Sequence, residues 1–124
     1  DVFSQVVKPG DTVIEAGANL GAHTLGLAQL AGPNGRVYAF EPQRLMFQTL
    51  LGNAALNSLT NIYGFQKALS NAPGKLLVPM QDCEKEVNWG GLALGSCSAL
   101  ARSIKPTRPL CDTKSSTDKG RSDT

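Results

Sequence analysis

Two acidic side chains and two glycines lie where strands of this sequence are expected to end. Glu15, Gly17, Asn19 and Gly21 fall within the stretch VIEAGANLGAHT, and Glu41 follows the apolar stretch VYAF. Glycine lets the backbone pass close to a ligand or adopt a positive φ, and the N-terminus of a following helix presents backbone N–H groups. A carboxylate at the end of the next strand can accept hydrogen bonds from both hydroxyls of a ribose. The set favours a ribonucleoside that carries a positive charge over a pyrophosphate.

Alternating strands and helices are expected to position these residues. Short apolar runs end in turn residues, and leucines recur at helical spacing between them. The order predicts an α/β fold, the first βαβαβ half of a doubly wound parallel sheet, with a further strand returning as a hairpin. The predicted strands are residues 12–16, 37–40, 62–69 and 75–78, and the predicted helices are residues 20–31 and 45–56.

Composition limits the function classes. The chain has 124 residues, which is one domain at most, and its net charge of +2 is too small to indicate a nucleic acid or an acidic membrane as partner. No apolar run approaches about 18 residues, and no secretory leader precedes the domain, so we expect a cytoplasmic protein. An odd number of cysteines (Cys83, Cys97 and Cys111) and a single histidine predict reduced thiols and no metal site.

Composition changes near Gly95. Residues 96–124 hold six Lys/Arg against three Asp, a net charge of +3, and ten Ser/Thr, with few apolar side chains after Ile104. Such a segment buries too little apolar surface to offset its ordering entropy. We therefore expect a folded part over residues 1–95 and a disordered tail over residues 96–124.

The motif E-x-G-x-N-x-G resembles motif I of the S-adenosylmethionine-dependent methyltransferases, and VYAFEP resembles their second motif. Together with LLGNAALNSLTNI, KALSNAPGKLLVP and NWGGLAL, these blocks resemble FkbM-type methyltransferases over roughly residues 5 to 95. The resemblance implies a Rossmann-like methyltransferase sheet and S-adenosyl-L-methionine as cofactor. The residues it implies at the cofactor are Glu15, Gly17, Ala18, Asn19, Gly21, Glu41, Pro42 and Ala68.

The resemblance also implies methyl transfer by in-line displacement, with O-methylation of a small molecule or sugar. The family's next block, similar to "iDvEG", has no counterpart after Gly95, so we expect a truncated or frame-shifted reading of a longer methyltransferase. The sequence identifies no catalytic base. An incomplete sheet leaves an edge uncovered, which predicts self-association.

Two other functions remain open from the sequence. The alternatives are a nucleoside-binding remnant without catalysis and a nicotinamide-dependent oxidoreductase. The second reading lacks the G-x-G-x-x-G spacing, because glycines follow Gly17 only at Gly21 and Gly26.

Structural explanations also compete with functional ones at single residues. The glycines would serve strand–helix packing. The acid of VIEAG would cap the first turn of the helix or face solvent, and the acid of VYAFEP would be a surface acid after its strand. Asn19 would be a turn or N-cap residue, and His23 a packing or solvated side chain. Asn53 and Asn57 are expected to cap or end the second helix.

Overall fold

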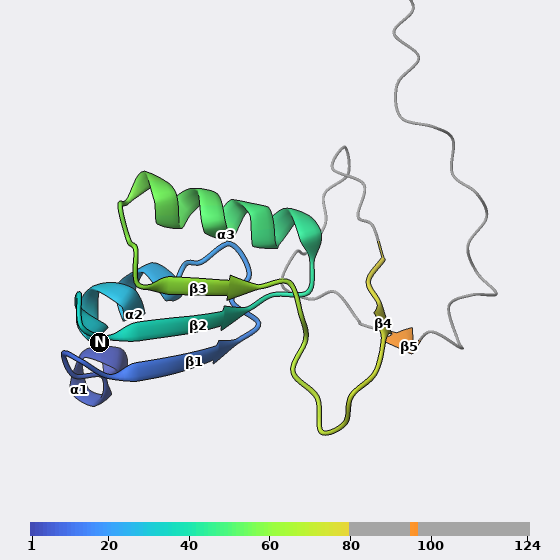
Figure 1. The fold of residues 1–124 in the computed structure, drawn as a ribbon, viewed down its shortest axis with the longest axis horizontal. Coiled ribbons are helices and arrows are strands. Elements are labelled where there is room, and N and C mark those ends of the chain that lie inside the picture. The colour runs from blue at the N-terminus through green and yellow to red at the C-terminus, as the bar shows by residue number, and fades with distance from the viewer. Residues whose placement is uncertain (80–94, 97–124) are drawn as a thin grey trace, which may run out of the picture.

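The computed structural model describes residues 1–79 and 95–96 (Figure 1). In chain order its elements are α1 (Val2–Val6), β1 (Thr12–Ala16), α2 (Thr24–Ala31), β2 (Arg36–Phe40), α3 (Arg44–Leu56), β3 (Ile62–Phe65), β4 (Leu76–Leu77) and β5 (Gly95–Ser96).

The first three strands form one parallel sheet in the order β1-β2-β3. Val13 pairs with Val37, and Val37 pairs with Ile62, so the carboxyl ends of the three strands meet at one edge of the sheet. The Rossmann-like βαβαβ half that the sequence predicts is thus confirmed. This arrangement brings the segments after Ala16 and Phe40 next to each other.

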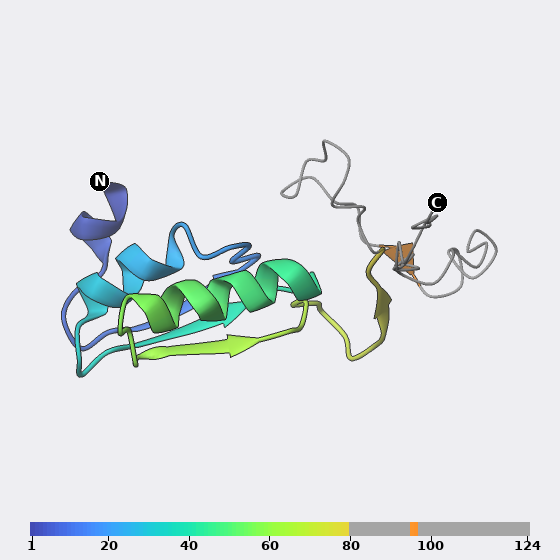
Figure 2. The same ribbon diagram turned by 90° about the horizontal axis from the view of Figure 1, so that it is seen from above.

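Both long helices cover the same face of the sheet (Figure 2). Val37 and Ala39 of β2 point into this layer and are fully buried. Val37 packs with Leu27 and Ala28 of α2, and Ala39 packs with Leu50 of α3. The core that fixes α2 and α3 against β2 therefore also fixes the loops that leave the carboxyl edge.

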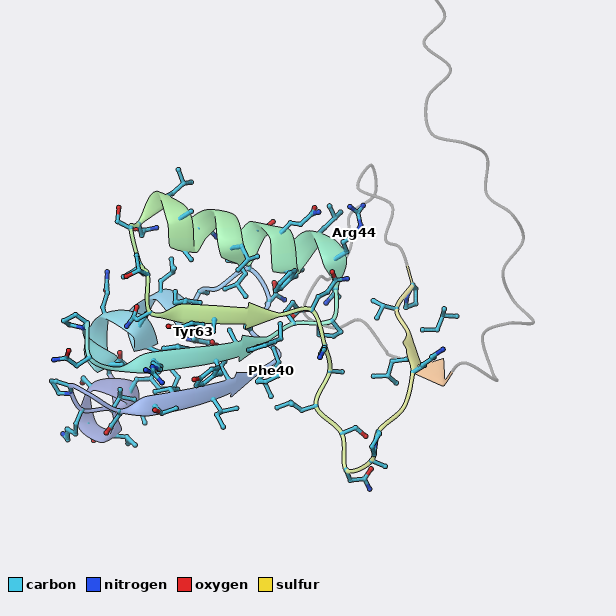
Figure 3. The ribbon with its side chains drawn as sticks, viewed as in Figure 1. Phe40, Arg44 and Tyr63 are labelled. Carbon is cyan, nitrogen blue, oxygen red and sulfur yellow. The ribbon has the colours of Figure 1, made fainter. Side chains whose placement is uncertain are left out.

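The opposite face of the sheet carries aromatic side chains that are half-buried or exposed. Tyr38 stacks on Tyr63 with ring centroids 5.4 Å apart, and Phe40 stacks on Phe65 at 5.1 Å. Figure 3 labels Phe40 and Tyr63 on neighbouring strands. Ile14 of β1, the register partner of Tyr38, is 67% exposed. Within residues 1–79, this face is left open to solvent.

Two predicted boundaries are wrong for identifiable reasons. The first helix begins at Thr24 and not at Leu20, because Asn19 and Gly21 adopt φ values of +54° and +96°, which an α-helix does not accommodate. The third strand ends at Phe65 and not at residue 69. There the carbonyl of Phe65 accepts hydrogen bonds from both Glu41 N and Lys67 N, which turns the chain away from the sheet.

The fourth predicted strand exists but has a different partner. β4 does not return as a hairpin onto β3; Leu76 and Leu77 pair antiparallel with Ser96 and Gly95 in a separate two-stranded sheet. α1, which the sequence analysis did not predict, is capped by the Asp1 side chain at Phe3 N. The three cysteines and the predicted disordered tail, apart from Ser96, lie outside the described residues.

None of the helices that the structure describes is long and apolar enough to cross a bilayer.

Candidate functional site

The site is built around residues 17–23, which we call the glycine loop. Gly17 has a φ of +73°, and the N–H groups of Gly17 and Ala18 both donate to the carbonyl of Phe40, at 2.8 and 3.0 Å. These two bonds extend the contact between β1 and β2 beyond the last paired residues. The start of the loop is therefore held by the end of β2.

The two glycines of the loop have different surroundings. A Cβ added at Gly17 would meet nothing within 4 Å, so the backbone there faces open space. A Cβ added at Gly21 would lie 2.7 Å from Cδ1 of Leu50 on α3. Gly21 therefore permits close packing of the loop on α3, whereas Gly17 presents backbone that a ligand can approach. The packing explanation weighed for the glycines holds for Gly21.

Glu41 is buried, with 3% of its surface exposed. Its Oε2 accepts a hydrogen bond from the backbone N–H of Asn19 at 2.8 Å, and its Oε1 accepts one from Gln43 N at 2.9 Å. Its own N–H donates to the carbonyl of Phe65. Glu41 thus connects the glycine loop, the turn before α3 and the end of β3, and it is not the surface acid that one sequence reading allowed.

Glu15 occupies a different position. It is half-buried on the helix-covered side of β1, and its Oε2 accepts a 2.5 Å hydrogen bond from the hydroxyl of Thr24. Thr24 was not among the site residues predicted from the sequence, where it falls inside the predicted helix 20–31. Only the observed helix start at Thr24 places its hydroxyl beside the strand that carries the acid.

The other polar residues of the loop act on its conformation. Asn19 is a turn residue: its Oδ1 accepts from Leu20 N, and the N-cap position of α2 belongs to His23.

The prediction that Asn53 caps or ends the second helix is wrong, because its Nδ2 donates to the carbonyl of Leu20 across 33 residues. Asn57 does end α3 as its C-cap.

His23 packs against a ring. Its imidazole lies edge-on to the ring of Phe3, with centroids 5.4 Å apart. The packing explanation for this residue agrees with the contact, which joins α1 to the start of α2.

A cavity of about 760 Å³ borders Pro42, the residue that follows Glu41 in the chain. Its lining comes from Pro42, residues 66–76 and Val78, within the part of the chain that the structure describes. Two of the predicted site residues, Pro42 and Ala68, meet at this cavity. The structure thus brings Pro42 and Ala68 together at the cavity, and it joins the glycine loop to Glu41 by a hydrogen bond.

Solved structures that are similar to this chain share its fold. The chain is similar to a protein from Clostridium thermocellum assigned as an rRNA methylase, with 30% identity, a TM-score of 0.53, and coverage of 55% of this chain and 37% of that one. It is also similar to a SAM-dependent O-methyltransferase from Thermotoga maritima, with 25% identity, a TM-score of 0.51, and coverage of 53% and 26%. No family model matches the chain.

The match thus spans between a quarter and two fifths of those two proteins. The fold of the described residues is that of the Rossmann-like methyltransferases, and its solved neighbours include S-adenosylmethionine-dependent enzymes.

Proposed function

We propose that residues 1–95 form the cofactor-binding part of an S-adenosylmethionine-dependent methyltransferase of the FkbM type. The observation that carries the proposal is the hydrogen bond between Asn19 N and Glu41, which joins the glycine loop and the acid of β2 at the carboxyl edge of a parallel sheet. Ligands of open α/β sheets bind at this edge.

The residues at this edge fit a charged ribonucleoside. Gly17 exposes backbone next to open space, which admits a ligand close to the loop. Each oxygen of Glu41 accepts one backbone N–H, and an ionised carboxylate has about four acceptor sites, so each can also accept a ribose hydroxyl. Glu15 offers a second negative charge for the ammonium or sulfonium of S-adenosylmethionine.

The cavity beside Pro42 suits the adenine. A planar base needs an apolar slot with a few polar groups, and Pro42, Ala68 and Leu69 supply apolar surface at the cavity. In this arrangement the ribose lies at Glu41 and the base lies beyond it, toward the turn after β3.

The cofactor, when bound, supplies an activated methyl group for in-line transfer to a nucleophile. The contribution of this chain is to hold the donor in one orientation, because positioning provides much of the rate when the methyl group is already activated. We propose a hydroxyl of a small molecule or sugar as the acceptor. The net charge of the chain does not exclude a nucleic acid as the acceptor, since the Clostridium neighbour is assigned as an rRNA methylase.

A second candidate is nucleoside binding without catalysis. The chain matches 37% and 26% of the lengths of the two neighbours, and the contacts described above concern cofactor binding alone. Titration calorimetry with S-adenosylhomocysteine, and with NADH as the competing ligand class, tests the binding site. Transfer of labelled methyl from S-adenosylmethionine to a cell extract then separates an enzyme from a binding remnant. Binding of NADH in preference to S-adenosylhomocysteine would overturn the proposal.

A further inference from the structure

The hydroxyl of Thr24 joins the start of α2 to β1. Thr24 is the first residue of α2 and is fully buried, and its Oγ1 donates to Oε2 of Glu15 at 2.5 Å. The hydroxyl of a threonine at a helix start commonly bonds a nearby backbone group of its own helix. Here it reaches a carboxylate nine residues earlier in the chain, on the strand that leads into the glycine loop.

This bond restrains a side chain that would otherwise be mobile. Glu15 is only half-buried, and a glutamate has several rotatable bonds whose freedom must be lost when a ligand is bound. A hydrogen bond to an ionised carboxylate is stronger than one between neutral groups. With Oε2 directed to Thr24, the orientation of the carboxylate is set before a ligand arrives, and ordering costs less on binding.

We propose that Thr24 is a positioning residue, which holds the carboxylate of Glu15 in place for the ammonium group of the amino-acid part of the cofactor. The inference rests on the proposed function, since it concerns the ligand proposed there. To the two acids of the proposed function it adds Thr24, a residue that does not touch the ligand and acts through Glu15.

The test compares two ligands on matched variants. S-Adenosylhomocysteine carries the ammonium group, and 5′-methylthioadenosine shares the adenine and ribose but lacks the amino-acid part. Thr24→Val removes the hydroxyl at nearly constant volume, and Thr24→Ser retains it. Affinities come from titration calorimetry, and circular dichroism confirms that each variant is folded. Thr24→Ala serves the same measurement if the valine variant does not fold.

We expect Thr24→Val to weaken the binding of S-adenosylhomocysteine by about 5- to 10-fold. The lost hydrogen bond affects binding only through the orientation of Glu15, so its effect is a part of the full strength of a bond to a charged group. Its affinity for 5′-methylthioadenosine should stay within about twofold, and Thr24→Ser should restore the wild-type value. In a Glu15→Gln background, Thr24→Val should cause no further loss.

The outcomes separate the two proposals. Wild-type protein that binds neither ligand overturns the proposed function and this inference with it. Wild-type protein that binds both, with Thr24→Val weakening both equally or neither, overturns the role of Thr24 alone, since a purely structural residue would not distinguish the ligands. Additive losses with Glu15→Gln would also overturn it.

Discussion

Asn19 and Glu41, 22 residues apart, are joined by a hydrogen bond of 2.8 Å from a loop amide to a buried carboxylate. The same carboxylate accepts from Gln43 N on its other oxygen. One side chain therefore fixes both loops at the carboxyl edge, where we propose that the ribose binds. The observed hydrogen bonds of Glu41 and its proposed role in ribose binding lead to separate predictions.

Replacing Glu41 should cost stability. Since Glu41 is 3% exposed and accepts two backbone N–H groups, we expect Glu41→Ala to lower the free energy of unfolding by about 2–4 kcal/mol. Urea denaturation measures the change. Gln48→Ala, on the exposed face of α3, is the control, and an equal small effect of both variants would contradict the bridging role.

Replacing Glu41 should also weaken ribose binding. Glu41→Gln retains one acceptor oxygen and is the better variant for this measurement, because it leaves more of the loop contacts in place. We expect its affinity for S-adenosylhomocysteine to fall by about 10-fold, or about 1.4 kcal/mol. The 2′-deoxy ligand should bind wild-type protein more weakly but lose little more in the variant. Additive losses from mutation and deoxygenation would show that Glu41 does not contact that hydroxyl.

The sequence predicted the strands of this site better than its loops. The bounds of β1 follow from the apolar run between a turn and the glycines, and the strand order follows from connection rules. The start of α2 was placed too early because Leu20 fits helical spacing, whereas the positive φ values at Asn19 and Gly21 exclude it from a helix. No local pattern distinguishes such a leucine from one in the helix.

Contacts between distant segments explain the remaining differences. That Glu41 is buried, and that Asn53 bonds Leu20, depends on how α3 packs over the glycine loop. The pairing of Leu76 and Leu77 with residues 95–96 likewise joins segments far apart in the chain. Residue types located the proposed cofactor acids, but only the packed structure shows what each carboxylate contacts.

Replacing Gly17 should weaken cofactor binding by more than the strain of its positive φ alone explains. Gly10 and Gly17 both have positive φ, at +92° and +73°, and an added Cβ meets nothing within 4 Å at either. Alanine at each should therefore cost a similar amount of stability, about 1–2 kcal/mol for the left-handed conformation. We expect Gly17→Ala to weaken S-adenosylhomocysteine at least 10-fold while Gly10→Ala leaves its affinity unchanged, as measured by calorimetry. Equal affinities of the two variants would remove Gly17 from the proposed site.

Gly21 should matter for packing. Its φ of +96° and the 2.7 Å approach of Leu50 Cδ1 to an added Cβ both oppose a side chain. We expect Gly21→Ala to lower the free energy of unfolding by about 2–4 kcal/mol. Gly52→Ala, within α3 and with nothing near its added Cβ, should instead raise it by about 0.5–1 kcal/mol, as alanine does in helices. Thermal denaturation of the two variants in opposite directions would confirm the contact with α3, and a stable Gly21→Ala would contradict it.

The open face of the sheet should cause the chain to self-associate. Ile14 and Tyr63 are 67% and 45% exposed beside the stacked rings of Tyr38, Phe40 and Phe65, and contiguous apolar surface of this kind favours association. We expect Ile14→Lys to reduce self-association, measured by sedimentation velocity over a range of concentrations, because a charge on this face must be desolvated in any contact. Leu56→Lys is the control, since Leu56 is 86% exposed at the end of α3, away from that face. A monomeric wild-type chain would contradict the prediction. An equal effect of both lysines would remove the support for this face as the contact, since the added net charge alone would then explain the change.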